Sequence, residues 1–93
     1  MHVIIKHKVK DYEAWKAEFD SFADFRKTSG EKSHRILHPG TDRNELTLLF
    51  EWDNEQNAET FLASTELKSA MERAGVADEP SITFLNEIAK GTF

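Results

Sequence analysis

The first ten residues alternate between apolar and polar side chains, which is the pattern of a β-strand with one buried face. This alternation predicts a strand from His2 to Lys10. One face would carry Val3, Ile5, His7 and Val9, and the opposite face would carry Ile4, Lys6, Lys8 and Lys10. His7 therefore interrupts an otherwise apolar face of the predicted strand.

From Tyr12 onward the apolar residues recur every three or four positions, which is the spacing of a helix with one buried side. The residues of this stripe are Tyr12, Trp15, Phe19, Phe22 and Phe25. Asp11 is a predicted N-cap, because its carboxylate can accept the free amide hydrogens of the first turn. Gly30 is expected to end the helix, since glycine adopts a positive φ at low cost.

The rest of the chain predicts three further strands. They run from about Lys32 to His38, from Glu45 to Trp52 and from Ser81 to Ala89, with a turn at residues 39–42. In the middle strand of these three, the apolar positions are Leu46, Leu48, Phe50 and Trp52. Such strong alternation is typical of a strand that packs on a core.

A second helical region is predicted between the last two strands. Asp53 and Gln56 form a predicted capping box, followed by a helix that would bury Ala58, Phe61 and Leu62. Ser64 is expected to cap a further helix with four inward residues, which are Leu67, Ala70, Met71 and Ala74. Gly75 and Val76 would end that helix in a Schellman motif.

The predicted order is strand, helix, strand, strand, helix, strand. Right-handed crossovers then place both helical regions on one face of a four-stranded antiparallel sheet, which is the ferredoxin-like α+β fold. The other face would mix apolar and charged residues: Ile4, Lys6, Lys8, Thr47, Leu49, Glu51, Thr83, Leu85 and Glu87. It is either exposed to solvent, which composition alone favours, or covered by the sheet of a second subunit. In either case Lys6 and Lys8 are expected to meet Glu51 or Glu87 as cross-strand pairs.

Composition and charge exclude several classes of function. A chain of 93 residues, 39% hydrophobic and 31% charged, suits one domain over residues 1–93. The net charge of −5 divides into +2 for residues 1–43 and −7 for residues 44–93, which disfavours nucleic acid and anionic membranes as partners. Zero cysteines exclude disulfides and cysteine-based metal sites. With no membrane-length apolar run and no signal-peptide pattern, we expect a cytoplasmic protein.

Two groups of residues together resemble a known family. They are Trp52-Asp53-Asn54-Glu55 with Ala58, Phe61, Ser64, Glu66-Leu67, Ala70-Met71 and Ala74-Gly75, and, near the start, Val9, Asp11-Tyr12 and Trp15-Lys16. The pattern resembles the dimeric α+β-barrel superfamily, and within it the small bacterial proteins of the antibiotic biosynthesis monooxygenase (ABM) type. The resemblance implies a homodimer whose two sheets pack face to face, with a pocket between helices and sheet in each subunit.

Members of this superfamily differ in activity. Similar proteins include oxygenases that oxidise polyketide phenols without metal or flavin, haem-degrading enzymes, small-lactone isomerases and proteins with no known reaction. Haem-degrading relatives use a histidine of the second helical region as iron ligand, and this chain has no histidine after His38. His34 and His38 would lie about 13 Å apart on one strand, too far to share a metal ion. We therefore expect no metal and no cofactor.

His7 and Asn86 are the candidate catalytic residues. Imidazole titrates near neutral pH, so His7 would serve as a proton acceptor or orienting donor in a pocket; the alternative is a core histidine bonded to a neighbouring polar group. Asn86 interrupts the apolar face of the last predicted strand in the same way, and the first and last strands should be neighbours. A hydrogen bond between His7 and Asn86 would follow from that arrangement.

Aromatic residues are the candidate substrate-binding group. They are Tyr12, Trp15, Phe19, Phe50 and Trp52, for which the alternative is an ordinary packed core. The resemblance implies a polar trio of Trp, Asn and Tyr types in the phenol oxygenases, which Trp52, Asn86 and Tyr12 match in type.

The sequence thus leads to two hypotheses of function. The first is a cofactor-independent monooxygenase, or an isomerase or cyclase, acting on a small planar aromatic or apolar substrate. The second is a non-catalytic homodimer that binds a small molecule or serves a structural role.

Overall fold

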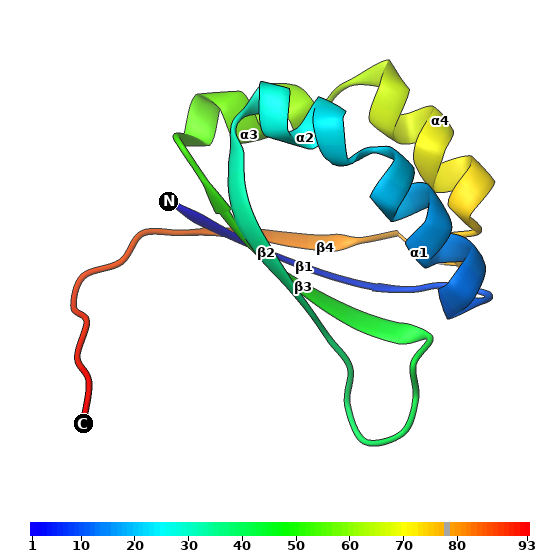
Figure 1. Ribbon diagram of the computed structural model, residues 1–93, viewed down its shortest axis with the longest axis horizontal. Helices are drawn as coiled ribbons and strands as arrows, with labels where there is room; N and C mark the ends of the chain where they lie inside the picture. The colour runs from blue at the N-terminus through cyan, green and yellow to red at the C-terminus, as the bar shows by residue number, and fades with distance from the viewer. Residues whose placement is uncertain (78) are drawn as a thin grey trace.

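The chain forms a four-stranded antiparallel sheet with four helices on one face. The computed structural model describes residues 1–77 and 79–93 (Figure 1). Its elements in chain order are β1 (His2–Lys8), α1 (Tyr12–Ser21), α2 (Ala23–Ser29), β2 (Glu31–Leu37), β3 (Glu45–Trp52), α3 (Glu55–Leu62), α4 (Thr65–Ala74) and β4 (Ser81–Leu85). The strands lie in the order β2-β3-β1-β4, and all neighbouring strands are antiparallel.

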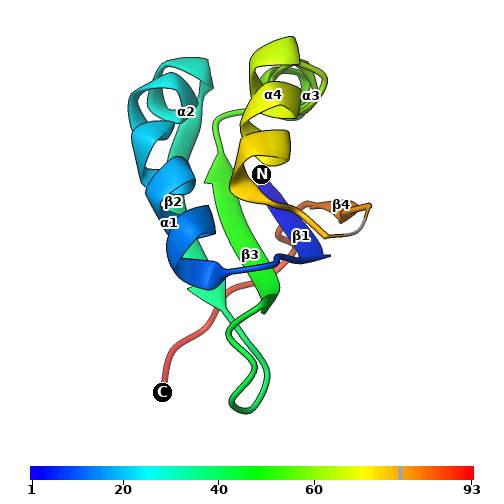
Figure 2. The ribbon, with the colours of Figure 1, turned by 90° about the vertical axis from the view of Figure 1, so that its right-hand side faces the viewer.

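The helices of the two crossovers lie side by side over the sheet (Figure 2). Helix α1 contacts α4, and α2 contacts α3, so the two pairs of helices form one layer. The ferredoxin-like α+β fold predicted from the sequence is therefore confirmed. Among the residues that the structure describes, no helix has both the length and the apolar composition needed to cross a membrane.

The helix predicted from Tyr12 to Gly30 is divided into α1 and α2 at Phe22, so the prediction of one continuous helix is wrong. The Phe22 amide donates to the carbonyl of Phe19, three residues back, which tightens the chain into a turn. Beyond this turn the buried residue of α2 is Arg26, whereas Phe25, which the sequence placed in the apolar stripe, is 37% exposed.

Most of the predicted helix ends are confirmed. The Asp11 carboxylate and the Ser64 hydroxyl each accept a hydrogen bond from an amide in the first turn of their helix. Gly75 has a φ of 72°, and the Val76 amide donates to the Met71 carbonyl at 3.3 Å, as in a Schellman motif.

The N-cap of α3 is Asn54 rather than the predicted Asp53. The Asn54 side-chain oxygen accepts the Asn57 amide at 2.8 Å. Asp53 instead accepts hydrogen bonds from the Asn54 amide at 2.7 Å and from the Asn57 side chain at 3.0 Å. Asp and Asn are about equally good N-cap residues, so residue type alone did not decide between these two neighbours.

The core lies between the helices and one face of the sheet. The buried residues of that face are the ones that the alternation predicted: Val3, Ile5, His7, Val9, Leu46, Leu48, Phe50 and Trp52. The helices contribute Trp15, Ala58, Phe61, Ala70 and Ala74. Trp52 packs on Phe61 with 5.1 Å between ring centroids.

None of the helices in residues 1–77 and 79–93 lies over the other face of the sheet (Figure 1). Two of its leucines are well exposed, Leu37 at 48% and Leu85 at 40%. The predicted pairing of its charges is wrong, because Lys6 lies opposite Thr47 and Lys8 lies opposite Glu45. Glu51, the predicted partner, lies opposite His2 near the other end of β1.

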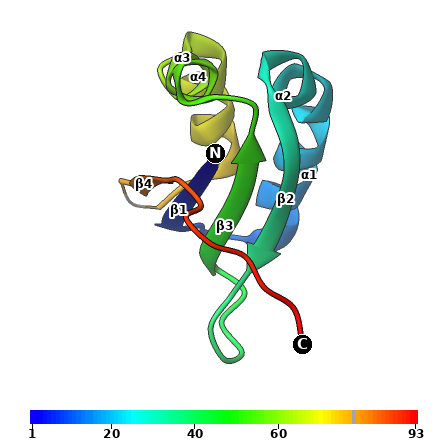
Figure 3. The same cartoon turned by 90° about the vertical axis from the view of Figure 1, so that its left-hand side faces the viewer.

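The last strand ends at Leu85 rather than at the predicted Ala89. Leu85 lies opposite His2, the first residue of β1, so the residues after Leu85 have no strand beside them to pair with. They extend away from the sheet (Figure 3) with exposed side chains, among them Ile88, which is fully exposed. Glu87, the other predicted partner of the lysines, belongs to this segment.

Candidate functional site

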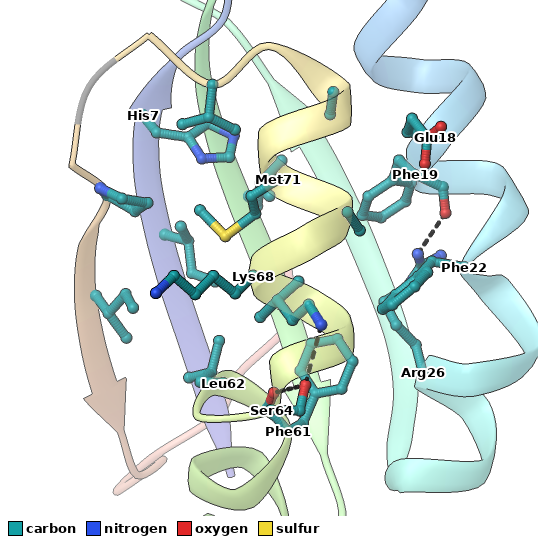
Figure 4. Close-up of a pocket in the computed structure, with 18 of the residues that line it drawn as sticks. His7, Glu18, Phe19, Phe22, Arg26, Phe61, Leu62, Ser64, Lys68 and Met71 are labelled. Carbon is teal, nitrogen blue, oxygen red and sulfur yellow. Dashed lines mark hydrogen bonds between the residues drawn. The ribbon is translucent and has the colours of Figure 1, made fainter.

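A cavity of about 550 Å³ lies between the helices and the sheet (Figure 4). Such a volume is within the range of about 300–1,000 Å³ found for small-molecule sites. The sheet contributes Ile5, His7, Leu48, Phe50 and Ile82. The helices contribute mainly apolar residues, including Trp15, Phe19, Phe22, Phe61, Leu67, Ala70 and Met71. The cavity therefore favours an apolar occupant.

Stacked aromatic rings form the wall of the cavity on the side of α1. Trp15 and Phe19 are nearly parallel, with 4.9 Å between ring centroids and 23° between ring planes. Phe19 also packs on Phe50 of β3, with 6.2 Å between ring centroids. The helical spacing of four residues places Trp15 and Phe19 on one side of α1, and tertiary packing then sets their flat stack. This surface suits a planar ring.

His7 is the polar residue of β1 in this wall. Its side chain is only 7% exposed, and its ring meets Trp15 edge-on, with 5.9 Å between centroids and 81° between planes. It follows Ile5 on the inward face of β1, and both residues line the cavity. Both ring nitrogens have less than 1 Å² of accessible surface, so proton transfer between His7 and a bound molecule requires a side-chain movement that opens one nitrogen to the cavity.

Arg26 is a second buried polar residue of the cavity, and it was not among the site residues predicted from the sequence. It is 4% exposed, and its Nε donates to Glu31 Oε1 at 2.8 Å. Its Nη1 donates to the carbonyl oxygen of Phe19, and the guanidinium carbon lies 3.6 Å from the centre of the Phe19 ring. Arg26 follows Phe22 by four positions, as Phe19 follows Trp15, so a charged residue in line with the apolar stripe was the available signal.

Four of the seven predicted site residues line the cavity, and three do not. Those that line it are His7, Trp15, Phe19 and Phe50. Trp52 is 3% exposed and packs in the core against Phe61. Tyr12 is half-buried beside Trp15, with the Arg43 guanidinium 4.5 Å from its ring centre.

Asn86 lies far from His7. It follows Leu85, which pairs with His2, so the two candidate catalytic residues lie at opposite ends of the β1–β4 pair. His2 and His7 are five positions apart along the strand, which corresponds to about 17 Å. The expected hydrogen bond between His7 and Asn86 is therefore wrong, and Asn86 is an exposed residue beyond the last strand.

Within residues 1–77 and 79–93, no group of three or more His, Asp or Glu side chains is arranged to hold a metal ion. His34 instead bonds Glu31, with 2.9 Å between Nδ1 and Oε2, and it meets the Phe19 ring edge-on at 5.0 Å. Glu31 thus connects His34 with Arg26 beside the aromatic wall.

Comparison with solved structures identifies the fold. No family model and no curated protein matches the chain. A protein of Bordetella bronchiseptica, provisionally described as an antibiotic biosynthesis monooxygenase, is 13% identical, with 95% of this chain and 96% of that one covered and a TM-score of 0.78. A Nitrosomonas europaea protein with the same provisional description is 16% identical, with coverage of 96% and 100% and a TM-score of 0.72.

A third similar structure is SnoaB of Streptomyces nogalater, described as a cofactor-independent oxygenase. It is 14% identical to this chain, with 92% of each chain covered and a TM-score of 0.71. Identities this low establish the fold and leave the activity open. The chain is thus ABM-like in its fold, which confirms the resemblance read from the sequence.

Proposed function

We propose that this protein binds a small planar aromatic molecule in the cavity and oxidises it with O₂ without a metal or an organic cofactor. The observation that carries the proposal is an apolar cavity of about 550 Å³ with His7 buried in its wall. A fold shared with SnoaB, a cofactor-independent oxygenase, supports the choice of reaction. The apolar wall formed by Trp15, Phe19 and Phe50 would border the substrate ring.

The reaction proposed is the oxidation of a phenol to a quinone. The substrate carries a hydroxyl group and a hydrogen on the ring carbon opposite to it. One O₂ is consumed: one oxygen atom becomes the second carbonyl of the quinone, and the other leaves as water with the two hydrogens. The phenolate gives an electron to O₂ far more readily than the neutral phenol does, so removal of the hydroxyl proton is the step that the protein would assist.

His7 would accept that proton after a side-chain movement opens one of its buried ring nitrogens to the cavity. It is buried against Trp15, and general-base catalysis by a positioned side chain contributes about 10²–10⁴-fold to a rate. The apolar walls would keep water away from the reactive intermediates. In this proposal Tyr12, Trp52 and Asn86 have no direct contact with the substrate.

The test is O₂ uptake with 1-naphthol and 1,5-dihydroxynaphthalene in the presence of a metal chelator, with products identified by mass spectrometry. We expect the corresponding quinones, and a loss of about 10²-fold or more in His7→Phe. His38→Phe is the matched control, because His38 is exposed beyond β2. Full activity in His7→Phe would remove His7 from the site. No turnover above the protein-free rate would contradict the reaction, and a product of unchanged mass would indicate isomerisation instead.

We also propose that the open face of the sheet packs against the same face of a second copy. The face presents apolar side chains of all four strands, Ile4, Leu37, Leu49 and Leu85, and two of them are well exposed in the monomer. Contiguous exposed apolar surface of this kind marks an interaction site. Lys8 lies opposite Glu45 on the neighbouring strand, so these two charges are placed to form a cross-strand pair within each sheet.

A further inference from the structure

Arg26 brings a permanent positive charge to the wall of an apolar cavity. Its side chain is 4% exposed, and it is one of the residues that line the cavity. A buried guanidinium is costly unless it is paired and hydrogen-bonded. Glu31, whose side chain is 9% exposed, provides the countercharge at 2.8 Å. The pair is therefore close to neutral, which makes a general anion-binding site a poor description of this wall.

The hydrogen bonds of Arg26 leave part of its guanidinium unused. An arginine side chain carries five N–H donors. Nε donates to Glu31 and Nη1 donates to the carbonyl oxygen of Phe19, whereas Nη2 donates to none of the residues that the structure describes. Nη2 is not one of the fully buried side-chain atoms that lack a hydrogen-bond partner among the described residues, so it is accessible. It is therefore a donor for whatever occupies the cavity, water included.

The guanidinium is also held in place. It lies 3.6 Å above the Phe19 ring, and Trp15 stacks on the same ring. Glu31 is itself fixed by His34, at 2.9 Å. A donor fixed at an aromatic wall recognises an acceptor on the edge of a ring that lies against that wall.

We infer that Arg26 selects the ligand: the cavity takes a planar aromatic molecule that carries an oxygen acceptor, a ring carbonyl or a phenolic oxygen, directed at Nη2. The inference rests on the proposed function and specifies its substrate class. His7 from β1 and Arg26 from α2 belong to different walls of the cavity (Figure 4). A bound ring therefore has a separate polar contact at each wall, and Arg26 is a specificity-determining residue.

The test compares two rigid planar compounds that differ in a single group. 9-Fluorenone carries a carbonyl where fluorene carries a methylene group, and equilibrium dialysis against the full chain gives both Kd values. The preference ratio is the Kd of fluorene divided by the Kd of fluorenone. We expect Arg26→Met to lower this ratio about tenfold, because a hydrogen bond to a charged group is lost.

Two variants separate recognition from folding. The double variant Arg26→Met/Glu31→Gln removes both charges, so it leaves no unpaired buried carboxylate, and it should show the same loss of preference. Glu31→Gln alone keeps the guanidinium and should keep the preference. A mutation-independent readout is the infrared carbonyl stretch of bound fluorenone, which should lie below its value in an apolar solvent.

An unchanged ratio in the folded double variant, or a carbonyl stretch equal to that in an apolar solvent, would overturn the role of Arg26. So would a loss in Glu31→Gln as large as that in Arg26→Met, because the effect would then belong to the packing of the network. Binding of both compounds with no preference would leave the proposed aromatic site intact and refute this inference alone. Absence of binding by either compound would overturn both.

Discussion

Gly30 connects the end of α2 to the start of β2, and its backbone lies close to Asp53, which follows β3. Replacement of Gly30 by alanine tests this close approach. Gly30 has a φ of 127°, a region that residues with a side chain rarely adopt. An added Cβ would lie 2.5 Å from Asp53 Oδ1 and 2.9 Å from Asp53 Cγ. The Gly30 carbonyl accepts the Asp53 amide at 3.0 Å, so the two backbones cannot separate without losing a hydrogen bond.

The cost of Gly30→Ala follows from three contributions. Backbone strain at such a φ costs about 2 kcal/mol. Displacement of the Asp53 carboxylate breaks its hydrogen bonds to Asn54 and Asn57, which costs about 1 kcal/mol more. The reduced entropy of the unfolded chain offsets about 0.5–1 kcal/mol. The net loss is about 2 kcal/mol, which lowers the Tm of a domain this small by about 8–16 °C.

Thermal unfolding followed by circular dichroism measures this shift, and two other glycines provide controls. Gly40 has a φ of 48° with nothing within 4 Å of an added Cβ, so Gly40→Ala should lower the Tm by less than Gly30→Ala. Gly91 has neither a positive φ nor a close neighbour, so Gly91→Ala should leave the Tm unchanged. A Gly30→Ala variant as stable as Gly91→Ala would refute the close approach of Gly30 and Asp53.

Three further predictions concern the cap of α4, the open sheet face and the Arg26 network. Ser64→Ala removes the acceptor of the Leu67 amide, so it should cost about 1 kcal/mol and lower the Tm by about 4–8 °C, whereas Ser69→Ala on the exposed side of the same helix should not. Leu49→Glu should convert a dimer into a monomer by native mass spectrometry, and a monomeric wild-type protein would contradict the proposed interface. Glu31→Ala leaves the Arg26 guanidinium buried without its countercharge, so it should cost about 3–5 kcal/mol by chemical denaturation; a change under about 1 kcal/mol would show that the pair is exposed to water.

The topology could be predicted because periodicity and helix ends agree along the chain. The alternation correctly assigned every buried position of β1 and β3. The Ser64 hydroxyl and the positive φ of Gly75 mark the start and the end of α4, as predicted. The break at Phe22 could not be predicted, because it involves neither proline nor glycine and falls within a continuous apolar stripe. The end of β4 at Leu85 depends on where its neighbour β1 begins, which is a property of the pairing and not of residues 86–89.

The candidate site was predicted in part, for a similar reason. The alternation of the strands and the helical spacing predict which side chains point inward. Four of these inward residues line the cavity: His7, Trp15, Phe19 and Phe50. Their roles in binding and catalysis remain predictions.

The residues that lie elsewhere depended on information that periodicity does not contain. Trp52 also points inward but packs over Phe61, since its place along β3 decides which part of the core it meets. The expectation for Asn86 depended on strand register, which one sequence does not fix. Arg26 was missed because a charged side chain on a helix is ordinarily solvated. Its burial depends on the ion pair with Glu31 and on the contacts with Phe19, which the sequence does not show.

The central claim is that the cavity between the helices and the sheet is a ligand site, and an NMR titration tests it most directly. ¹H–¹⁵N correlation spectra of the full chain would be recorded with increasing 9-fluorenone. We predict saturable shifts concentrated at cavity residues such as Trp15, Phe19, Leu67 and Met71, with little change at Leu49 on the open face. Shifts confined to the open face, or no shifts up to the solubility limit of the compound, would contradict the claim.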